Sequence, residues 1–113
     1  MPFDPKLADR LRVVMTNLCN DEDGLEERKM FGGICFSLNG NMCLGIHKDR
    51  LIARVGVEAA AKLLKEAHVR PMDLTGKPMK GWIMAEAAAI KTEKNLAKFC
   101  GYAAEFVRTL PAK

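Results

Sequence analysis

The chain lacks several signals that mark large classes of proteins. Its four cysteines, Cys19, Cys35, Cys43 and Cys100, have no C-x-x-C spacing. Its apolar runs stay well below the roughly 18 residues needed to cross a bilayer. The opening M-P-F-D-P-K has no basic segment followed by an apolar one, so it does not resemble a secretory signal. We therefore expect a cytoplasmic protein with reduced thiols and no membrane partner.

Internal repeats and low-complexity segments are also missing. The segment G-K-P-M-K-G at residues 76–81 does not have the G-x-x-x-x-G-K-[ST] order of a phosphate-binding loop, and we interpret it as a turn that carries two lysines. A chain of 113 residues is the usual size of one domain, so we predict a single domain over residues 1–113.

The charge is mildly basic. The chain has 18 basic and 14 acidic residues, which gives a net charge of +4. Residues of both signs are interspersed along the chain, which favours a mixed solvated surface over one that follows a phosphate backbone. Weak nucleic-acid binding remains an alternative.

Apolar residues alternate with other residues in two neighbouring stretches, which is typical of strands with one buried face. The first stretch contains Ile34, Phe36 and Leu38, and the second contains Met42, Leu44 and Ile46. A three-residue loop, Asn39-Gly40-Asn41, with Asn41 or Gly40 left-handed, would place these six residues on one face as the pairs 38–42, 36–44 and 34–46. A two-residue turn would put Phe36 opposite Cys43 and send the two sets to opposite faces, so we predict the longer loop.

A third strand follows the tight turn Lys48-Asp49 and extends the same apolar face, which gives a three-strand meander. Its apolar residues, Leu51, Ala53 and Val55, are expected opposite Ile46, Leu44 and Met42. The reverse face is predicted to be solvated or to meet a partner, and it carries Cys35, Ser37, Cys43, Gly45, His47, Arg50, Ile52 and Arg54.

Helices are predicted at both ends of the chain. Asp4-Pro5 is a typical helix start, and apolar residues follow it at helical spacing as far as Leu18. Thr92 is expected to cap a final helix with a strong apolar stripe that runs to Leu110, where Pro111 stops it. Between residues 20 and 24 we expect an acidic, flexible link, and residues 25–29 should lead into the first strand.

The middle of the chain predicts one more helix and a second hairpin. Residues 57–67 consist of strong helix formers, with Ala60, Leu63, Leu64 and Ala67 as the inward set. Residues 69–74 should be extended and 79–85 should form a strand, while 85–90 is interpreted as a connector. The predicted fold class is α+β, a two-layer arrangement in which an antiparallel sheet, a meander plus a second hairpin, is covered by the N- and C-terminal helices.

Candidate chemistry is sparse. Cys35, Cys43 and His47 share the reverse face in the predicted register, so a metal site is conceivable, but a fourth ligand and paired spacing are missing. A Cys-His nucleophile would also need an orienting third group. We therefore expect no catalytic residue, no metal and no cofactor.

Two further features of the sequence can each be interpreted either as structural or as functional. Gly32-Gly33 could form an anion-binding nest, although a bulge or a close backbone approach fits better. Six basic residues, Arg28, Lys29, Arg50, Arg54, Lys77 and Lys80, could converge beside Trp82, whose ring could stack on a base. Taken alone, each of these basic side chains is most simply interpreted as solvent-exposed, and Trp82 is expected to be partly buried.

The motif R-K-M-F-G-G at residues 28–33 resembles the N-terminal domain of the TfoX/Sxy family, bacterial proteins associated with the regulation of natural competence. The similarity continues through the hairpin at 39–41, the D-x-L-x-x-R-V run at 49–55, the segment G-K-P-M-K-G-W at 76–82, and V-R-T-L-P at 107–111. It covers nearly the whole chain.

This resemblance implies an α+β domain with an antiparallel sheet flanked by helices and no established catalytic activity. It implies a regulatory role through protein contacts, with a transcription regulator or a second copy of the chain as the partner. Full-length competence regulators of this kind carry a second, C-terminal helical domain, which this sequence, ending at Lys113, does not include. The candidate interaction surface comprises Arg28, Lys29, Phe31, Gly32 and Gly33, with Lys80 and Trp82 expected nearby.

Overall fold

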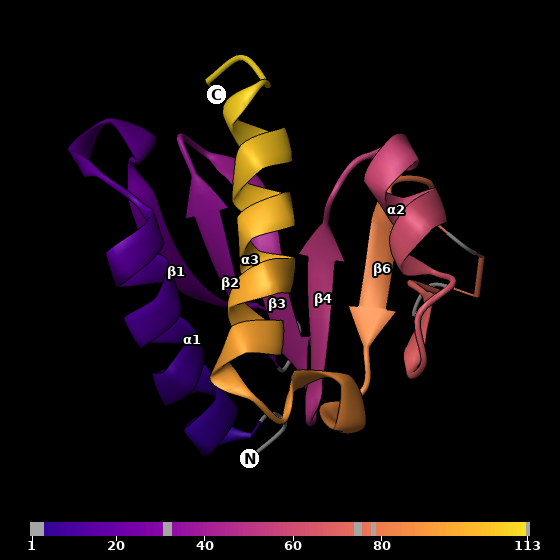
Figure 1. Ribbon diagram of the computed structural model, residues 1–113. Coiled ribbons are helices and arrows are strands. Elements are labelled where there is room, and N and C mark those ends of the chain that lie inside the picture. Colours follow the sequence, from indigo (N-terminus) through magenta and orange to yellow (C-terminus); the bar gives the residue numbers. More distant parts are fainter. Residues whose placement is uncertain (1–3, 31–32, 74–75, 78, 113) are drawn as a thin grey trace.

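The structure is a computed structural model that describes residues 4–30, 33–73, 76–77 and 79–112. Its helices lie on one side of a twisted antiparallel sheet (Figure 1). In chain order the elements are α1 (Pro5–Leu18), the 3-10 turn η1 (Asp21–Asp23), β1 (Leu25–Met30), β2 (Gly33–Leu38), β3 (Asn41–His47), β4 (Arg50–Arg54), α2 (Val57–Leu63), β5 (Val69–Pro71), β6 (Trp82–Ala85), the 3-10 turn η2 (Ala87–Ile90) and α3 (Glu93–Arg108).

The predicted fold class is confirmed, and the sheet is larger than expected. Within the described residues it has six strands in the order β1-β2-β3-β4-β6-β5, and every neighbouring pair is antiparallel. The second hairpin forms, and its later strand, β6, lies between β4 and β5. The extra strand is β1, which carries mostly charged residues and pairs with β2 along its whole length. Charged side chains are common on exposed sheet edges because they discourage pairing with other chains.

Both terminal helices begin where the sequence predicts. The Asp4 carboxylate accepts a hydrogen bond from the Lys6 amide at 2.9 Å, and the Thr92 hydroxyl accepts one from the Asn95 amide at 3.1 Å. Each cap satisfies an amide that the first helical turn leaves without a partner.

The helix predicted over residues 57–67 is shorter than expected and ends at Leu63. His68, with φ of 65°, turns the chain into β5. Leu64 and Ala67 are consequently exposed, whereas Ala60 and Leu63 are buried as predicted.

The loop between β2 and β3 differs from the prediction. It is a two-residue turn in which Asn39 and Gly40 both have positive φ, 51° and 83°. This is the backbone pattern of a type I′ turn, whose twist matches that of the strands it joins. Leu38 is therefore opposite Asn41 rather than Met42.

A bulge in β3 reconciles this short turn with the apolar pattern. The pairs Phe36–Leu44 and Ile34–Ile46 form as predicted, but the register shifts between Phe36 and Ser37. Cys43 is the extra residue on β3, and it belongs to the main core together with Leu44. The predictions that Met42 lies on the core face and Cys43 on the reverse face were wrong, because the extra residue reverses the facing of the β3 residues between the bulge and the turn, while Leu38 on β2 stays in the core.

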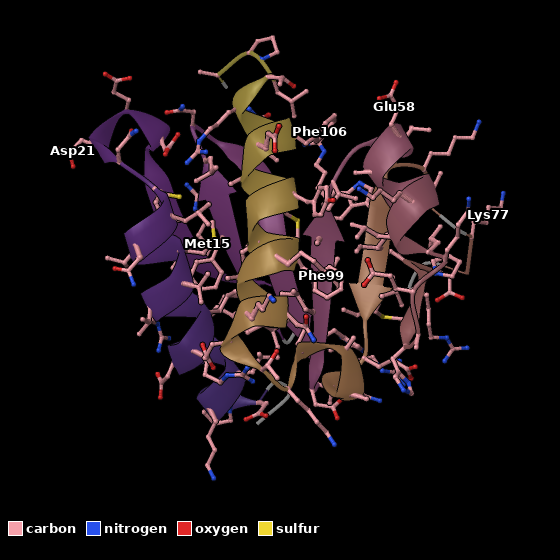
Figure 2. The ribbon with its side chains drawn as sticks, viewed as in Figure 1. Met15, Asp21, Glu58, Lys77, Phe99 and Phe106 are labelled. Carbon is pink, nitrogen blue, oxygen red and sulfur yellow. The ribbon has the colours of Figure 1, made fainter. Side chains whose placement is uncertain are left out.

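The core lies between the sheet and the helices. Met15 of α1 and Phe99 of α3 are almost completely buried in it, and Figure 2 shows both side chains in the layer around α3. Leu51 and Ala53 pair with Ile46 and Leu44 on this side, as expected. Within the described ranges, no helix is long and apolar enough to span a bilayer.

The acidic segment at residues 20–24, predicted to be a flexible link, folds as η1. The Asn20 side chain accepts from the Glu22 amide, and the Asp23 carboxylate accepts from the Asn20 amide at 3.0 Å. Asp23 also pairs with Arg108 of α3, a partner that is remote in the sequence.

Candidate interaction surface

One row of side chains crosses the sheet on the side that faces away from the helices. Directly opposite residues of antiparallel strands point to the same face, so the register identifies the row. We call it the cross-sheet row, and its members in spatial order are Arg28, Cys35, Gly45, Ile52, Met84 and Arg70. Each of the six strands contributes one residue, with an arginine at both ends and small or apolar residues between them.

The apolar part of the row is buried although the described helices all lie on the other side of the sheet. Cys35, Ile52 and Met84 are 6%, 5% and 3% exposed, yet none of them belongs to the main core cluster. Met42 crosses the middle of the row, because its Cε atom lies 3.1 Å from the position that a Cβ on Gly45 would take. The molecule thus has a thin second apolar layer on its helix-free face.

Charged groups border this layer. Arg28 is mostly exposed and pairs with Glu26 at 3.0 Å, and an Arg70 nitrogen lies 3.8 Å from a Glu86 oxygen. Arg50, opposite His47, is half-buried on the same face. Basic groups therefore flank an apolar strip along the helix-free face.

The sequence-predicted surface residues are divided between the two faces. Arg28 lies on the helix-free face, whereas Lys29 is opposite Ile34 and therefore lies on the helix side. Gly33 is buried in β2. Phe31 and Gly32 lie outside the described residues.

Lys80 and Trp82, expected near this group, are remote from it. Trp82 is in β6, and three strands, β2, β3 and β4, separate β6 from β1. Trp82 is half-buried, as predicted, and the Arg54 guanidinium lies 5.7 Å from the centre of its ring. The structure thus places Arg54 beside Trp82 but keeps Arg28 and Lys29 at the opposite edge. The sequence patterns did not identify Met84 and Arg70 as members of this row, since the pairing of β6 with β4 and β5 has no local signature.

The conceivable metal site is not assembled. Cys43 lies in the core, on the other face from Cys35 and His47. Desolvation raises the pKa of the Cys43 thiol to about 12, and burial also raises the pKa of Cys100 above its ordinary value. Among the residues that the structure describes, no three His, Cys, Asp or Glu side chains are grouped so that they could hold a metal ion.

Comparison with known families identifies one relationship. The sequence model of the TfoX N-terminal domain matches residues 17–107. These residues include every described strand and most of α3, and hence the whole cross-sheet row. No curated protein and no solved structure matches the chain.

Proposed function

The chain belongs to the TfoX N-terminal domain family, and from this premise we propose that it is a non-enzymatic regulatory domain that acts by binding another protein. The observation that carries the proposal is the pair of exposed arginines, Arg28 and Arg70, at the two ends of the cross-sheet row on the helix-free face. Exposed charges on one face offer electrostatic complementarity to a partner of opposite charge. The role implied by the family resemblance, regulation of competence or transcription, supports a transcription regulator as that partner.

The chemistry of the face defines what the partner must present. Ile52 and Met84 are only 5% and 3% exposed, so the contacts available to a partner are those of the terminal arginines, Arg28 and Arg70, which need carboxylates. In the part of the chain that the structure describes, the carboxylates beside both arginines belong to surface glutamates, so an acidic partner can compete for them.

A charge-reversal experiment tests the proposal. The double variant Arg28→Glu and Arg70→Glu changes only the two ends of the row, both of which are exposed. The matched control, Lys65→Glu and Lys94→Glu, makes the same charge change at exposed positions on the helix side. We expect the first variant to lose binding to a purified regulator, identified by affinity capture from native extract, while the control retains it and both keep the wild-type melting temperature. Equal binding by both variants contradicts the proposal.

The same comparison covers self-association. If the partner is a second copy of the chain, sedimentation of the wild type will show a dimer that the row variant loses and the control keeps. A dimer that survives in the row variant uses another surface.

Nucleic-acid binding is a second candidate, favoured by the arginines of the helix-free face and the nearby Trp82 ring. Its test is a salt titration of binding to short single- and double-stranded DNA. Binding through phosphates must weaken steeply as the salt concentration rises. A flat response, or no binding, rejects this candidate.

A further inference from the structure

A hollow opens on the helix side of the molecule, between the end of β4, the start of α2 and the later part of α3. We call it the α2–α3 hollow, and its volume is about 530 Å³. Its lining includes Arg54, Val57, Lys80, Tyr102, Glu105 and Phe106. Figure 2 shows Phe106 on the side of α3 that faces α2, with Glu58 at the beginning of α2. This volume is in the range of pockets that bind small molecules.

Gly56 and Gly81 form the floor of the hollow, and backbone hydrogen bonds join the two segments that contain them. The Val55 and Gly56 amides both donate to the Gly81 carbonyl, at 2.9 and 3.0 Å. Gly56 has φ of 87°, and a Cβ there would lie 2.6 Å from the Phe106 ring. The ring therefore packs directly on the backbone, which gives the hollow a rigid aromatic wall.

The wall formed by the Tyr102 ring is also fixed by a neighbouring side chain. The Lys62 ammonium donates a hydrogen bond to the Tyr102 hydroxyl at 3.1 Å and lies 5.6 Å from the centre of the same ring. Two aromatic rings of α3 consequently border the hollow with their orientations set by neighbouring groups.

Arg54 is the most informative residue of the lining. Its guanidinium lies 5.7 Å from the centre of the Trp82 ring and 5.9 Å from that of Phe106, and its side chain is half-buried. Over the described ranges, no carboxylate oxygen comes within 4.0 Å of it. By contrast, Arg10, Arg12 and Arg108 each have a carboxylate partner. A half-buried cation fixed between two rings without an anion is prepared to receive one.

The other charges of the hollow restrict which anion fits. Lys80 adds a second cation, while Glu58 and Glu105 add two exposed carboxylates, so these four side chains sum to zero charge, and Lys62 beside Tyr102 adds one positive charge. A monoanion bound to Arg54 is compensated under these conditions, whereas the further charges of a nucleotide are not.

We propose that the α2–α3 hollow binds a monocarboxylate with an aromatic or branched apolar body. The carboxylate pairs with Arg54, and the apolar body packs against Phe106 and Val57, whose side chain is 64% exposed at the rim. The same chemistry is presented by a free carboxylic acid and by the C-terminal residue of a peptide. The α2 and α3 residues of the lining lie on the helix side, and Arg54 reaches the hollow from the end of β4. Arg28 and Arg70, the ends of the cross-sheet row, do not line it.

The chain provides its own reporter, because Trp82 is its single tryptophan and contacts Arg54. The probes are N-acetyl-phenylalanine and its uncharged amide, titrated by Trp82 emission and by calorimetry. We expect the acid to bind and the amide to bind at least about tenfold more weakly, because the charge-assisted hydrogen bond is lost. A hexapeptide that ends in phenylalanine separates the two sources. Tighter binding than the acid indicates a chain terminus, whereas equal or weaker binding indicates a free acid, and both results support the site.

Substitutions test whether the acid binds in the α2–α3 hollow. Arg54→Gln should weaken binding of the acid by at least about tenfold, while Arg50→Gln, at the other end of the same strand and also half-buried, should leave it unchanged. Val57→Asp adds a negative charge at the exposed rim without altering the core, and it should weaken the acid more than the amide. Melting temperatures establish that the variants are folded.

Three results overturn the inference. They are equal affinity for acid and amide, equal loss in the two arginine variants, and no binding of either probe at about 10 mM. None of these results bears on the protein partner, which is tested through Arg28 and Arg70, residues that do not line the hollow.

Discussion

The side chains of Arg108 and Asp23 form a two-pronged ion pair that fastens the end of α3 to the segment between α1 and β1. The Arg108 Nε and Nη2 atoms each donate to one Asp23 oxygen, and both distances are 3.0 Å. Nη2 also donates to the Leu18 carbonyl at the end of α1. One guanidinium thereby joins three elements, and the buried carboxylate has its partners satisfied.

Removing the charge of Asp23 should destabilise the fold. Asp23→Asn cannot form the same pair, and we expect a loss of about 2 kcal/mol in the free energy of unfolding. The value stays below that of a fully buried pair because the Arg108 side chain is 40% exposed and partly screened by water. Urea titration measures it. The control is Asp21→Asn, an exposed neighbour in the same turn, which should change stability by less than about 0.5 kcal/mol. Equal effects of the two substitutions would show that the pair contributes nothing.

The contribution of Asp23 should depend on pH. The hydrogen bond from Arg108, and then that from the Asn20 amide, lower the pKa of Asp23 below its ordinary value of 3.8. A carboxyl group with a lower pKa in the folded state stabilises the fold above its unfolded pKa and loses this effect as the pH falls through its folded pKa. The stability difference between wild type and Asp23→Asn should therefore be constant from about pH 7 to pH 5 and shrink below about pH 4. A difference that grows toward low pH contradicts this assignment.

A methyl group at Gly56 should disturb the packing of Phe106. Gly56 and Gly76 have nearly the same positive φ, 87° and 90°, but an added Cβ meets the Phe106 ring at Gly56 and nothing within 4 Å at Gly76. Gly76→Ala should then cost about 1 kcal/mol of backbone strain. Gly56→Ala should cost about 3 kcal/mol, since the ring must also move. Urea titration of both variants separates the two effects, and similar costs would mean that Phe106 moves freely.

Cysteine reactivity should follow burial. Cys43 and Cys100 are fully buried, and desolvation raises the pKa of both, that of Cys43 to about 12. Iodoacetamide at about pH 8 should leave both unmodified in the folded protein and modify both in denaturant. Cys19 is only half-buried and should react in the native state. Peptide mass spectrometry measures each site. Native modification of Cys43 as fast as that of Cys19 would contradict its position in the core.

Much of the architecture could be predicted from local patterns. Asp4-Pro5 and Thr92 mark the helix starts correctly because a cap depends on residues within one turn. The alternation through Ile34, Phe36 and Leu44 identifies strands, and their predicted pairings with Ile46, with each other and with Ala53 are present.

The candidate site was less predictable. Cys35, Gly45 and Ile52 were assigned to the reverse face correctly because their strands are joined by short turns. Met84 and Arg70 complete the row only through pairings between strands that are far apart in sequence. Arg54 likewise gains its aromatic neighbours from β6 and α3.

Capping residues, helical stripes and period-two alternation were enough to establish an antiparallel sheet under terminal helices, since each depends on interactions between near neighbours in the chain. Tertiary contacts decided the bulge that moves Cys43 into the core, the pairing of charged β1, and the insertion of β6 between β4 and β5. They also created the two surfaces on which function is proposed, because the cross-sheet row and the α2–α3 hollow are built from residues that only folding brings together.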